Sequence, residues 1–458
     1  MRIALVACVV MLSASVWRPV MAQPPDTGAP QDAQPPEQPS PPDPPPPFDT
    51  GFRFHGYLRS GFGVDGTGKG QQAFQAPLSG AKYRLGNEAE TYLETTFDYG
   101  TKSEDPDPAY FDTRLTFAYV APTSQSNAFT TTLSLREAYA LARQIWESQP
   151  NATFWAGERF YDRHDVHLMD YYYRDPSGFG GGVENIEIGE DTKMSVAWIG
   201  GTSDQLDANG TVPKNELYRF NKNSFDVKLF GFPVGSGQLS IAFDMSHFNG
   251  DDVVQTAGAA PIVLGDNFGG STTAIVESPF TGGRNKVVVQ YGSGAAYDFR
   301  SIFTPPAGRT FLPGEHVDPG QLWQFRIVND LLIEQRGPWQ FQGVFIYQEL
   351  DNGAAANNRL KWVSFGGRPV YQLGRFFSLA TEAGWDHTAQ SGLPGGSLFK
   401  LTVAPQITPA LKFLSRPSLR AFATWAHWSD EFRGQVAPVG YADATKGTAF
   451  GVQLESWW

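Results

Sequence analysis

The stretch FRFHGYLRSGF, residues 52–62, decides the fold because its apolar and polar residues alternate. Successive side chains of a β-strand point to opposite faces, so the alternation predicts a strand with one apolar and one polar face. The apolar face carries Phe52, Phe54, Leu58 and Phe62, and the polar face carries Arg53, His55, Tyr57 and Arg59. The same pattern recurs to the end of the chain.

Alternation predicts about eighteen strands, an even number, as bacterial single-chain barrels require. They lie near residues 52–63, 88–99, 110–120, 133–143, 152–160, 182–189, 193–200, 224–230, 237–247, 272–279, 285–292, 322–329, 338–349, 360–370, 375–387, 397–406, 417–427 and 448–458. The alternation of apolar and polar residues also places Tyr92, Glu94 and Trp457 on the polar faces of their strands.

Alternation alone leaves two architectures open, a soluble sandwich with its apolar faces in a core and a membrane barrel with its apolar faces in lipid. Three observations favour the barrel. Apolar faces recur in about eighteen segments, aromatic residues gather at strand ends as membrane interfaces require, and the chain stops on Trp458 at the end of a strand. Closure would also remove free sheet edges. We therefore predict an all-β fold, a transmembrane antiparallel β-barrel of about 18 strands with a water-filled lumen.

The composition agrees with many strands joined by tight turns. The 458 residues include 34 phenylalanines, 17 tyrosines, 12 tryptophans and 49 glycines. The net charge of −12, without a basic stripe, argues against a nucleic-acid partner. Cys8 is the only cysteine and lies in a predicted signal peptide, so the mature chain would depend on a closed sheet for its stability rather than on disulfides.

The first fifty residues differ from the rest of the chain. Residues 1–22 combine a basic start at Arg2 with an apolar stretch and small residues near Ala22, as secretory signal peptides do. Residues 23–50 form a proline-rich arm, which we predict to be a disordered tether rather than a specific peptide ligand. The barrel takes residues 51–458, and export would place it in the outer membrane of a Gram-negative bacterium, in contact with lipid.

Several stretches resemble the maltoporin family. They are HGYLRSG at 55–61, KYRLGNE at 82–88, WAGERFYDRHDVH at 155–167, SRP at 415–417 and the final Trp457-Trp458. The resemblance covers roughly residues 52–458 and is strongest in the first third. It implies an eighteen-strand barrel that assembles as a homotrimer, with its third loop folded inward as a constriction.

The resemblance also implies facilitated diffusion of maltose and maltodextrins. A row of aromatic rings, the slide, contacts the apolar faces of the sugar, and charged polar tracks exchange hydrogen bonds with its hydroxyls. Each contact has to be weak and repeated for the sugar to pass. Slide residues match Tyr57, Tyr92, Phe129 and Trp457, and polar-track or constriction residues match Arg59, Arg84, Glu94, Arg136, Arg163, Asp170, Tyr172 and Asp175.

Two positions depart from the slide, since Arg284 and Leu414 stand where the family has aromatic residues. The natural sugar is therefore left open. The alternatives are a porin for another sugar, such as sucrose, and a surface-receptor barrel with a closed pore. Arg163, Tyr172 and Asp175 keep the maltoporin pattern and favour maltodextrins.

Catalysis and metal binding are not indicated by the sequence. No segment presents a nucleophile with a base and an orienting acid, so we predict no enzyme activity and no cofactor. His164 and His167, with Asp165 between them, have the look of a metal site. This signal is weak because no third ligand is evident, and we predict no metal.

Overall fold

The computed structural model describes residues 50–104, 108–121, 132–204, 219–253, 262–302, 306–307, 316–356 and 358–458. The predicted signal peptide, the proline-rich arm up to residue 49 and the slide candidate Phe129 lie outside these residues. Within the described ranges, no helix is long and apolar enough to cross a membrane.

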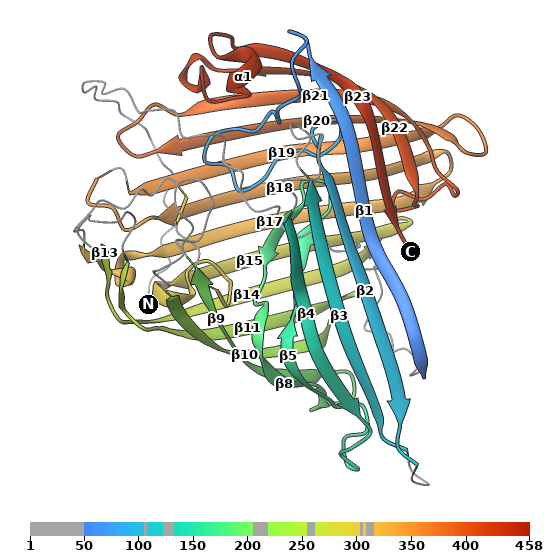
Figure 1. Ribbon diagram of the computed structural model, residues 1–458, viewed down its shortest axis with the longest axis vertical. Helices are drawn as coiled ribbons and strands as arrows, with labels where there is room; N and C mark the ends of the chain where they lie inside the picture. Colours follow the sequence, from blue (N-terminus) through green and yellow to red (C-terminus); the bar gives the residue numbers. More distant parts are fainter. Residues whose placement is uncertain are drawn as a thin grey trace.

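Eighteen antiparallel strands form one closed sheet (Figure 1). The barrel closes between β1 (Gly51–Asp65) and β23 (Lys446–Trp457), where Tyr57 lies opposite Trp457. The other barrel strands, each paired with its neighbour along the chain, are β2 (Thr91–Lys102), β3 (Tyr110–Ala121), β4 (Thr132–Arg143), β5 (Thr153–Arg159), β8 (Gly178–Glu187), β9 (Lys193–Asp204), β10 (Arg219–Val234), β11 (Gly237–Phe248), β14 (Asn267–Phe280), β15 (Gly283–Ser293), β17 (Trp323–Arg336), β18 (Trp339–Asp351), β19 (Arg359–Gln372), β20 (Phe377–Gln390), β21 (Gly396–Ile407) and β22 (Ser418–Trp428). The prediction of an all-β antiparallel barrel of about 18 strands is confirmed.

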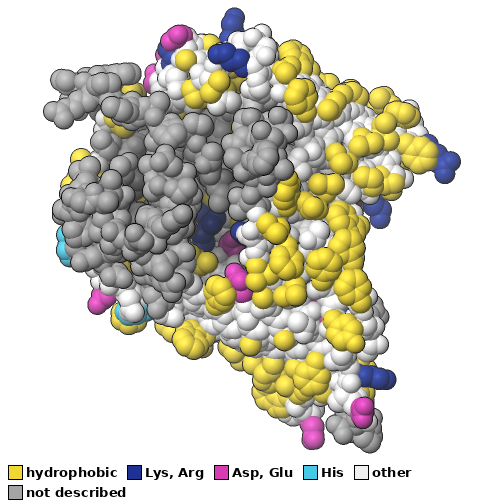
Figure 2. Space-filling view, in the orientation of Figure 1, with side chains coloured by type: hydrophobic (Ala, Val, Ile, Leu, Met, Phe, Trp, Pro, Cys, Tyr) yellow, Lys and Arg dark blue, Asp and Glu magenta, His cyan; other side chains and the backbone are white. Residues whose placement is uncertain are grey.

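The alternation sorts side chains as predicted. In β1, Phe52, Phe54 and Phe62 are exposed on the outer face, whereas Tyr57 and Arg59 are buried on the inner face. Figure 2 shows hydrophobic side chains spread over much of the outer surface on one face of the molecule. An apolar outer face is what a barrel presents to lipid.

The remaining elements are short and lie in the loops. They are the hairpin of β6 (His164–Val166) and β7 (Tyr171–Arg174), the three-stranded sheet of β12 (Asp251–Val253), β13 (Ile262–Leu264) and β16 (His316–Val317), the 3-10 turns Gly294–Ala296, Pro319–Gln321 and Asp430–Phe432, and α1 (Pro438–Tyr441).

The first loop, residues 66–90 between β1 and β2, folds into the lumen and lies against β20 and β21 (Figure 1). The backbone N–H of Leu85 donates to Glu382 Oε1 at 3.0 Å, and Lys400 Nζ donates to the Leu85 carbonyl at 2.7 Å. Here one prediction was wrong. The second strand begins at Thr91 and not near residue 88, because Arg84 pairs with Glu88 at 2.7 Å and keeps it in the loop.

The third loop, residues 160–177 between β5 and β8, carries the β6–β7 hairpin and folds inward as predicted. Together with the first loop it packs on the inner wall through an apolar cluster. The buried cluster consists of Ala81, Tyr83, Val166, Leu168, Met169, Tyr171, Tyr173, Ile275, Val288, Val328, Val344, Ile346 and Trp362. We predicted a water-filled lumen narrowed by the third loop, rather than one filled by side chains. Instead, part of it is packed like a protein core, because the loops bring apolar side chains onto an apolar stretch of wall.

Candidate functional site

Three of the four predicted slide rings lie side by side where the barrel closes. Tyr57 stands between Tyr92 of β2 and Trp457 of β23, with ring centroids 6.1 Å and 6.4 Å away. All three face inward because β1 pairs with both β2 and β23, in registers that put the polar faces of the three strands on the same side of the sheet. Tyr57 is 0% exposed and Tyr92 1%, whereas Trp457 is partly exposed.

Arginine side chains lie over two of these rings. Arg59 Cζ is 5.2 Å from the centre of the Tyr92 ring, and Arg416 Cζ is 4.2 Å from the Trp457 ring. A guanidinium group within about 6 Å of a ring face is attracted to it. A sugar that stacks on this face of Trp457 therefore has to displace Arg416.

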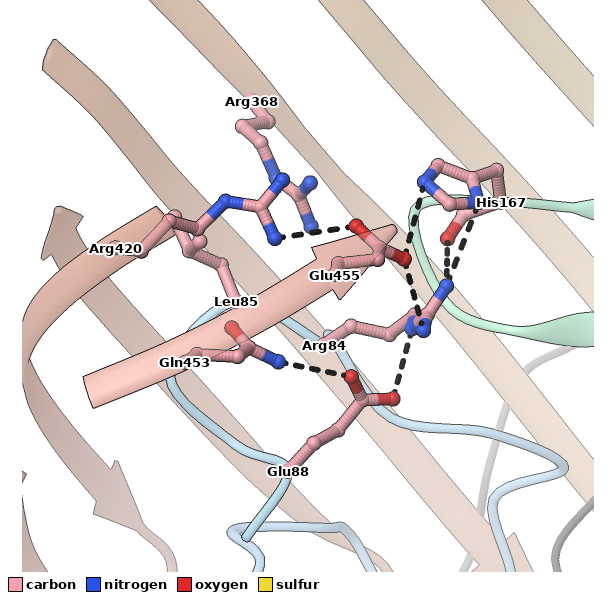
Figure 3. A pocket seen from close by; sticks show the side chains of 8 residues that line it. All are labelled: Arg84, Leu85, Glu88, His167, Arg368, Arg420, Gln453 and Glu455. Atoms are coloured by element: carbon pink, nitrogen blue, oxygen red, sulfur yellow. Dashed lines mark hydrogen bonds and ion pairs between the residues drawn. The ribbon is translucent and has the colours of Figure 1, made fainter. Parts of the chain in front are cut away.

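Glu455 of β23 is the carboxylate at which several cations meet (Figure 3). Its Oε2 lies 2.6 Å from Arg416 Nη2 and 3.1 Å from Arg420 Nη1. Its Oε1 lies 3.2 Å from Arg84 Nη2 and accepts a hydrogen bond from the Tyr57 hydroxyl at 3.1 Å. Because a buried charge without a partner is strongly destabilising, this carboxylate holds the guanidinium groups beside the rings.

The same cluster surrounds His167 of the third loop, whose Nε2 is 3.0 Å from Arg416 Nη2. Burial lowers the pKa of the His167 ring well below its usual value, and the charges of Arg84 and Arg416 lower it further against the opposing effect of Glu455. His167 is therefore neutral at neutral pH. A narrow pocket here is lined by Arg84, Leu85, Glu88, His167, Arg368, Arg420, Gln453 and Glu455 (Figure 3).

Glu88 of the first loop is the second carboxylate of this pocket. Burial alone would raise its pKa, but the guanidinium groups of Arg84 and Arg59 outweigh burial and lower the pKa to about 2. Arg84 Nε lies 2.7 Å and Arg59 Nη1 3.4 Å from Glu88 Oε1. The carboxylate is therefore ionised at neutral pH.

The predicted polar-track residues fall into two neighbouring groups. The first joins the closing strands to the loops: Arg59 Nη1 lies 2.8 Å from Asp170 Oδ2, and the Tyr92 hydroxyl donates to Glu94 Oε1 at 2.6 Å. Arg84 belongs to this group through its bond to the Tyr57 hydroxyl.

The second group lies around the third loop. Arg163 Cζ is 4.1 Å from the centres of the Tyr172 and Phe160 rings, and its Nε is 3.2 Å from Asp175 Oδ1. Arg136 of β4 lies 5.7 Å from the Phe160 ring. The structure thus brings cations, carboxylates and aromatic rings together around the third loop.

The two departures from the slide, Arg284 and Leu414, both contact β17. Arg284 Nη1 is 3.6 Å from Glu277 Oε2 and 3.8 Å from Asp330 Oδ2, distances too long for hydrogen bonds. The Leu414 amide, in the turn between β21 and β22, donates to Glu334 Oε2 at 3.4 Å.

Sequence reasoning did not single out Glu455 or Arg416 as site residues, and it considered His167 only as a metal ligand. Signals for them existed: Glu455 shares the inward face of its strand with Trp457, and the other two lie in stretches that carry the family resemblance. His164 pairs with Asp162 at 3.0 Å. Among the described residues, no three His, Cys, Asp or Glu side chains are grouped so that they could hold a metal ion.

Residues 52–458, nearly the whole chain, match the LamB porin family. The chain belongs to this family. Membership in the LamB porin family, together with the closed barrel, makes the protein an outer-membrane porin and indicates a channel rather than an enzyme.

Solved porin structures are similar to this LamB porin in barrel form with little shared sequence. The channel DcaP of Acinetobacter baumannii has 10% identity and a TM-score of 0.46, over 89% of this chain and 97% of that chain. OmpF of Salmonella typhi, in complex with daunomycin, has 9% identity and a TM-score of 0.45, over 89% and 97%. An anion-selective porin from Comamonas acidovorans has 10% identity and a TM-score of 0.44, over 90% and 100%. The family match carries the assignment.

Proposed function

We propose that this LamB porin is a sugar-selective channel through which maltose and maltodextrins cross the outer membrane by facilitated diffusion, and that it works as a homotrimer. The observation that carries the proposal is the row of Tyr92, Tyr57 and Trp457, with centroid spacings of 6.1 Å and 6.4 Å, in contact with arginines and carboxylates. A sugar ring has apolar C–H faces and a polar rim, so rings beside charged groups match both parts.

In this proposal the sugar enters by exchange. It takes the place of the Arg416 guanidinium over Trp457, while Glu455 keeps its other partners Arg84 and Arg420. A sugar ring thus replaces the Arg416 guanidinium on the same face of the Trp457 ring. Exchange of one weak contact for another suits a channel, because the sugar is not trapped.

A second candidate, a surface-receptor barrel with a closed pore, is favoured by one observation. Tyr57 and Tyr92 are completely buried, and the first and third loops pack against the wall. A receptor would keep this packing, whereas a channel has to open it transiently to let a sugar pass.

Swelling of proteoliposomes in isotonic sugar solutions separates these functions. We expect faster swelling in maltose than in sucrose, two disaccharides of the same size, and measurable swelling in maltotriose. Faster swelling in sucrose would replace the maltodextrin proposal by the sucrose alternative. Swelling in none of the sugars, with the barrel shown to be folded by its heat-dependent gel mobility, would favour the closed receptor.

A further inference from the structure

We propose that Arg174 is a positioning residue that fixes the third loop to the barrel wall and so sets the aperture of the pore. The starting point lies on the wall, where Asp226 of β10 and Asp244 of β11 are directly opposite each other. Both face the lumen and are buried. Like charges opposite each other in a sheet are destabilising, and buried charges without partners more so. This wall therefore needs a cation.

Arg174, at the end of β7, supplies that cation. Its Nη1 lies 2.8 Å from Asp244 Oδ2, and its Nη2 pairs with Asp226 Oδ2. Its Nε lies 2.8 Å from Oδ2 of Asp162, which precedes β6. The guanidinium group is thus held by three carboxylates, and its side chain is 0% exposed. We call these four residues the third-loop anchor.

The surrounding polar groups complete the anchor. Ser271 donates to Asp244 Oδ2 at 2.6 Å, and the Tyr161 hydroxyl donates to Asp226 Oδ1 at 3.0 Å. Lys228 of β10 pairs with Asp162. Burial alone would raise the pKa of Asp162. Lys228 and the His164 ring outweigh the effect of burial and keep the pKa of Asp162 well below its usual value. The Asp162 carboxylate on the loop is therefore ionised. It needs cations as partners, as the two carboxylates on the wall do.

The anchor controls the aperture through its neighbours in sequence. Asp162 is followed by Arg163, and Arg174 is followed by Asp175. Arg163 and Asp175 are predicted track residues and pair at 3.2 Å. Each end of the β6–β7 hairpin thus carries one anchor residue next to one predicted polar-track residue. If the hairpin leaves the wall, Arg163 and Asp175 move with it. This inference rests on the proposed function and goes beyond it by naming what holds the constriction.

The first test is Arg174→Met, which keeps an unbranched side chain and removes the charge. Three carboxylates then face one another with Lys228 nearby, and the loop should leave the wall. In planar bilayers we expect noisier small-ion current. The maltotriose concentration that blocks half of the current should rise roughly 10- to 100-fold, by analogy with changes of residues that orient metal ligands. Arg433→Met is the matched control, because Arg433 lies in the exposed loop after β22 and pairs with Asp430.

The second test keeps the inference falsifiable if Arg174→Met does not assemble. The triple variant Arg174→Met, Asp226→Asn, Asp244→Asn removes the opposed charges together with the cation. If the anchor acts through charge, this variant should regain folding, quiet current and sugar block, while Arg174→Lys should lie between parent and methionine variant. A single variant that behaves like the parent, or a triple variant as defective as the single one, would overturn the inference. If no sugar blocks even the parent, the proposed function fails, and the current noise of the variants still tests the anchor.

Discussion

Replacement of Arg416 by lysine should strengthen the block of ionic current by maltodextrins. The guanidinium group lies 4.2 Å from the Trp457 ring centre and covers a face on which the sugar is proposed to stack. Lysine keeps the positive charge beside Glu455, which Arg416 contacts at 2.6 Å, but lacks the planar group that lies flat on a ring. The change therefore uncovers the ring without leaving the carboxylate unpaired.

The magnitude follows from the contact that the sugar no longer has to displace. A cation–π contact is worth about 0.5–1 kcal/mol when exposed and about 2 kcal/mol when desolvated. The Arg416 side chain is 1% exposed, which favours the upper part of this range. About 1–2 kcal/mol corresponds to a factor of roughly 5 to 30 in affinity. We expect the half-blocking concentration of maltotriose to fall by that factor.

The assay is current block in planar bilayers, read as a double-mutant cycle with Trp457→Ala. In the Arg416→Lys background, removal of the ring should weaken the block by about 1–3 kcal/mol, the worth of a base–aromatic stacking contact, which is roughly 5- to 150-fold, and small-ion conductance should hold or rise. In the parent the loss should be smaller, because Trp457→Ala also removes the cost of displacing Arg416. In the Trp457→Ala background, Arg416→Lys should then have no further effect. Arg433→Lys, in the exposed loop after β22, serves as the charge-conserving control.

Two results would refute this reasoning. If Arg416→Lys leaves the block unchanged while Trp457→Ala weakens it, the sugar does not use the covered face of the ring. If the double variant Arg416→Lys, Trp457→Ala is blocked by maltotriose as strongly as Arg416→Lys alone, the ring only packs the wall, and Tyr92→Ala should also leave the block unchanged.

Four further predictions concern trimer assembly, the proline-rich arm, the two departures from the slide (Arg284 and Leu414), and the pH dependence of stability. Detergent-extracted protein should migrate as a trimer on unheated gels and as a monomer after heating; a stable monomer with normal sugar-dependent current would contradict the trimer. Deletion of residues 23–47 should leave assembly and conductance nearly unchanged, and loss of trimers would make the arm an assembly element. Arg284→Phe combined with Leu414→Trp should make affinity rise more steeply from maltose to maltohexaose; no gain for maltohexaose would mean that these positions do not line the sugar path. Because the folded-state pKa of His167 lies below its usual 6.5, the unfolded chain takes up the proton first as pH falls. Stability should then drop by about 1.4 kcal/mol per pH unit below about 6.5, until the folded-state pKa is reached. His167→Gln should flatten the unfolding temperature measured between pH 7.5 and 5.5.

The strands could be predicted from sequence wherever alternation was regular. The range 397–406 was predicted, and Gly396–Ile407 is observed. The prediction was poorer for β8, placed at 182–189 but beginning at Gly178, because a run of glycines resembles a loop. These glycines allow close strand approach: a Cβ on Gly180 would lie 2.1 Å from the Trp198 carbonyl oxygen.

The interior of the barrel could be predicted only in part. The resemblance matched Tyr57, Tyr92 and Trp457 to one slide, and alternation placed each of them on the polar face of its strand. The course of the first loop could not be predicted, because its Leu85–Glu382 hydrogen bond joins residues 297 apart in sequence. The Asp226–Asp244 pair likewise becomes visible only once the register of β10 and β11 is known. Local patterns predict the strands of the wall, whereas long-range ion pairs, hydrogen bonds and apolar contacts determine how the loops fill the interior.

Single-channel recording in a planar bilayer shows whether this LamB porin conducts maltodextrins. With maltose, maltotriose and maltohexaose added in turn to one side, we expect brief, complete interruptions of the ionic current. Their duration should grow with the number of glucose units, and sucrose at the same concentration should give shorter ones. If no maltodextrin interrupts the current of an open channel, or if the folded protein carries no current at all, the protein is not a maltodextrin channel.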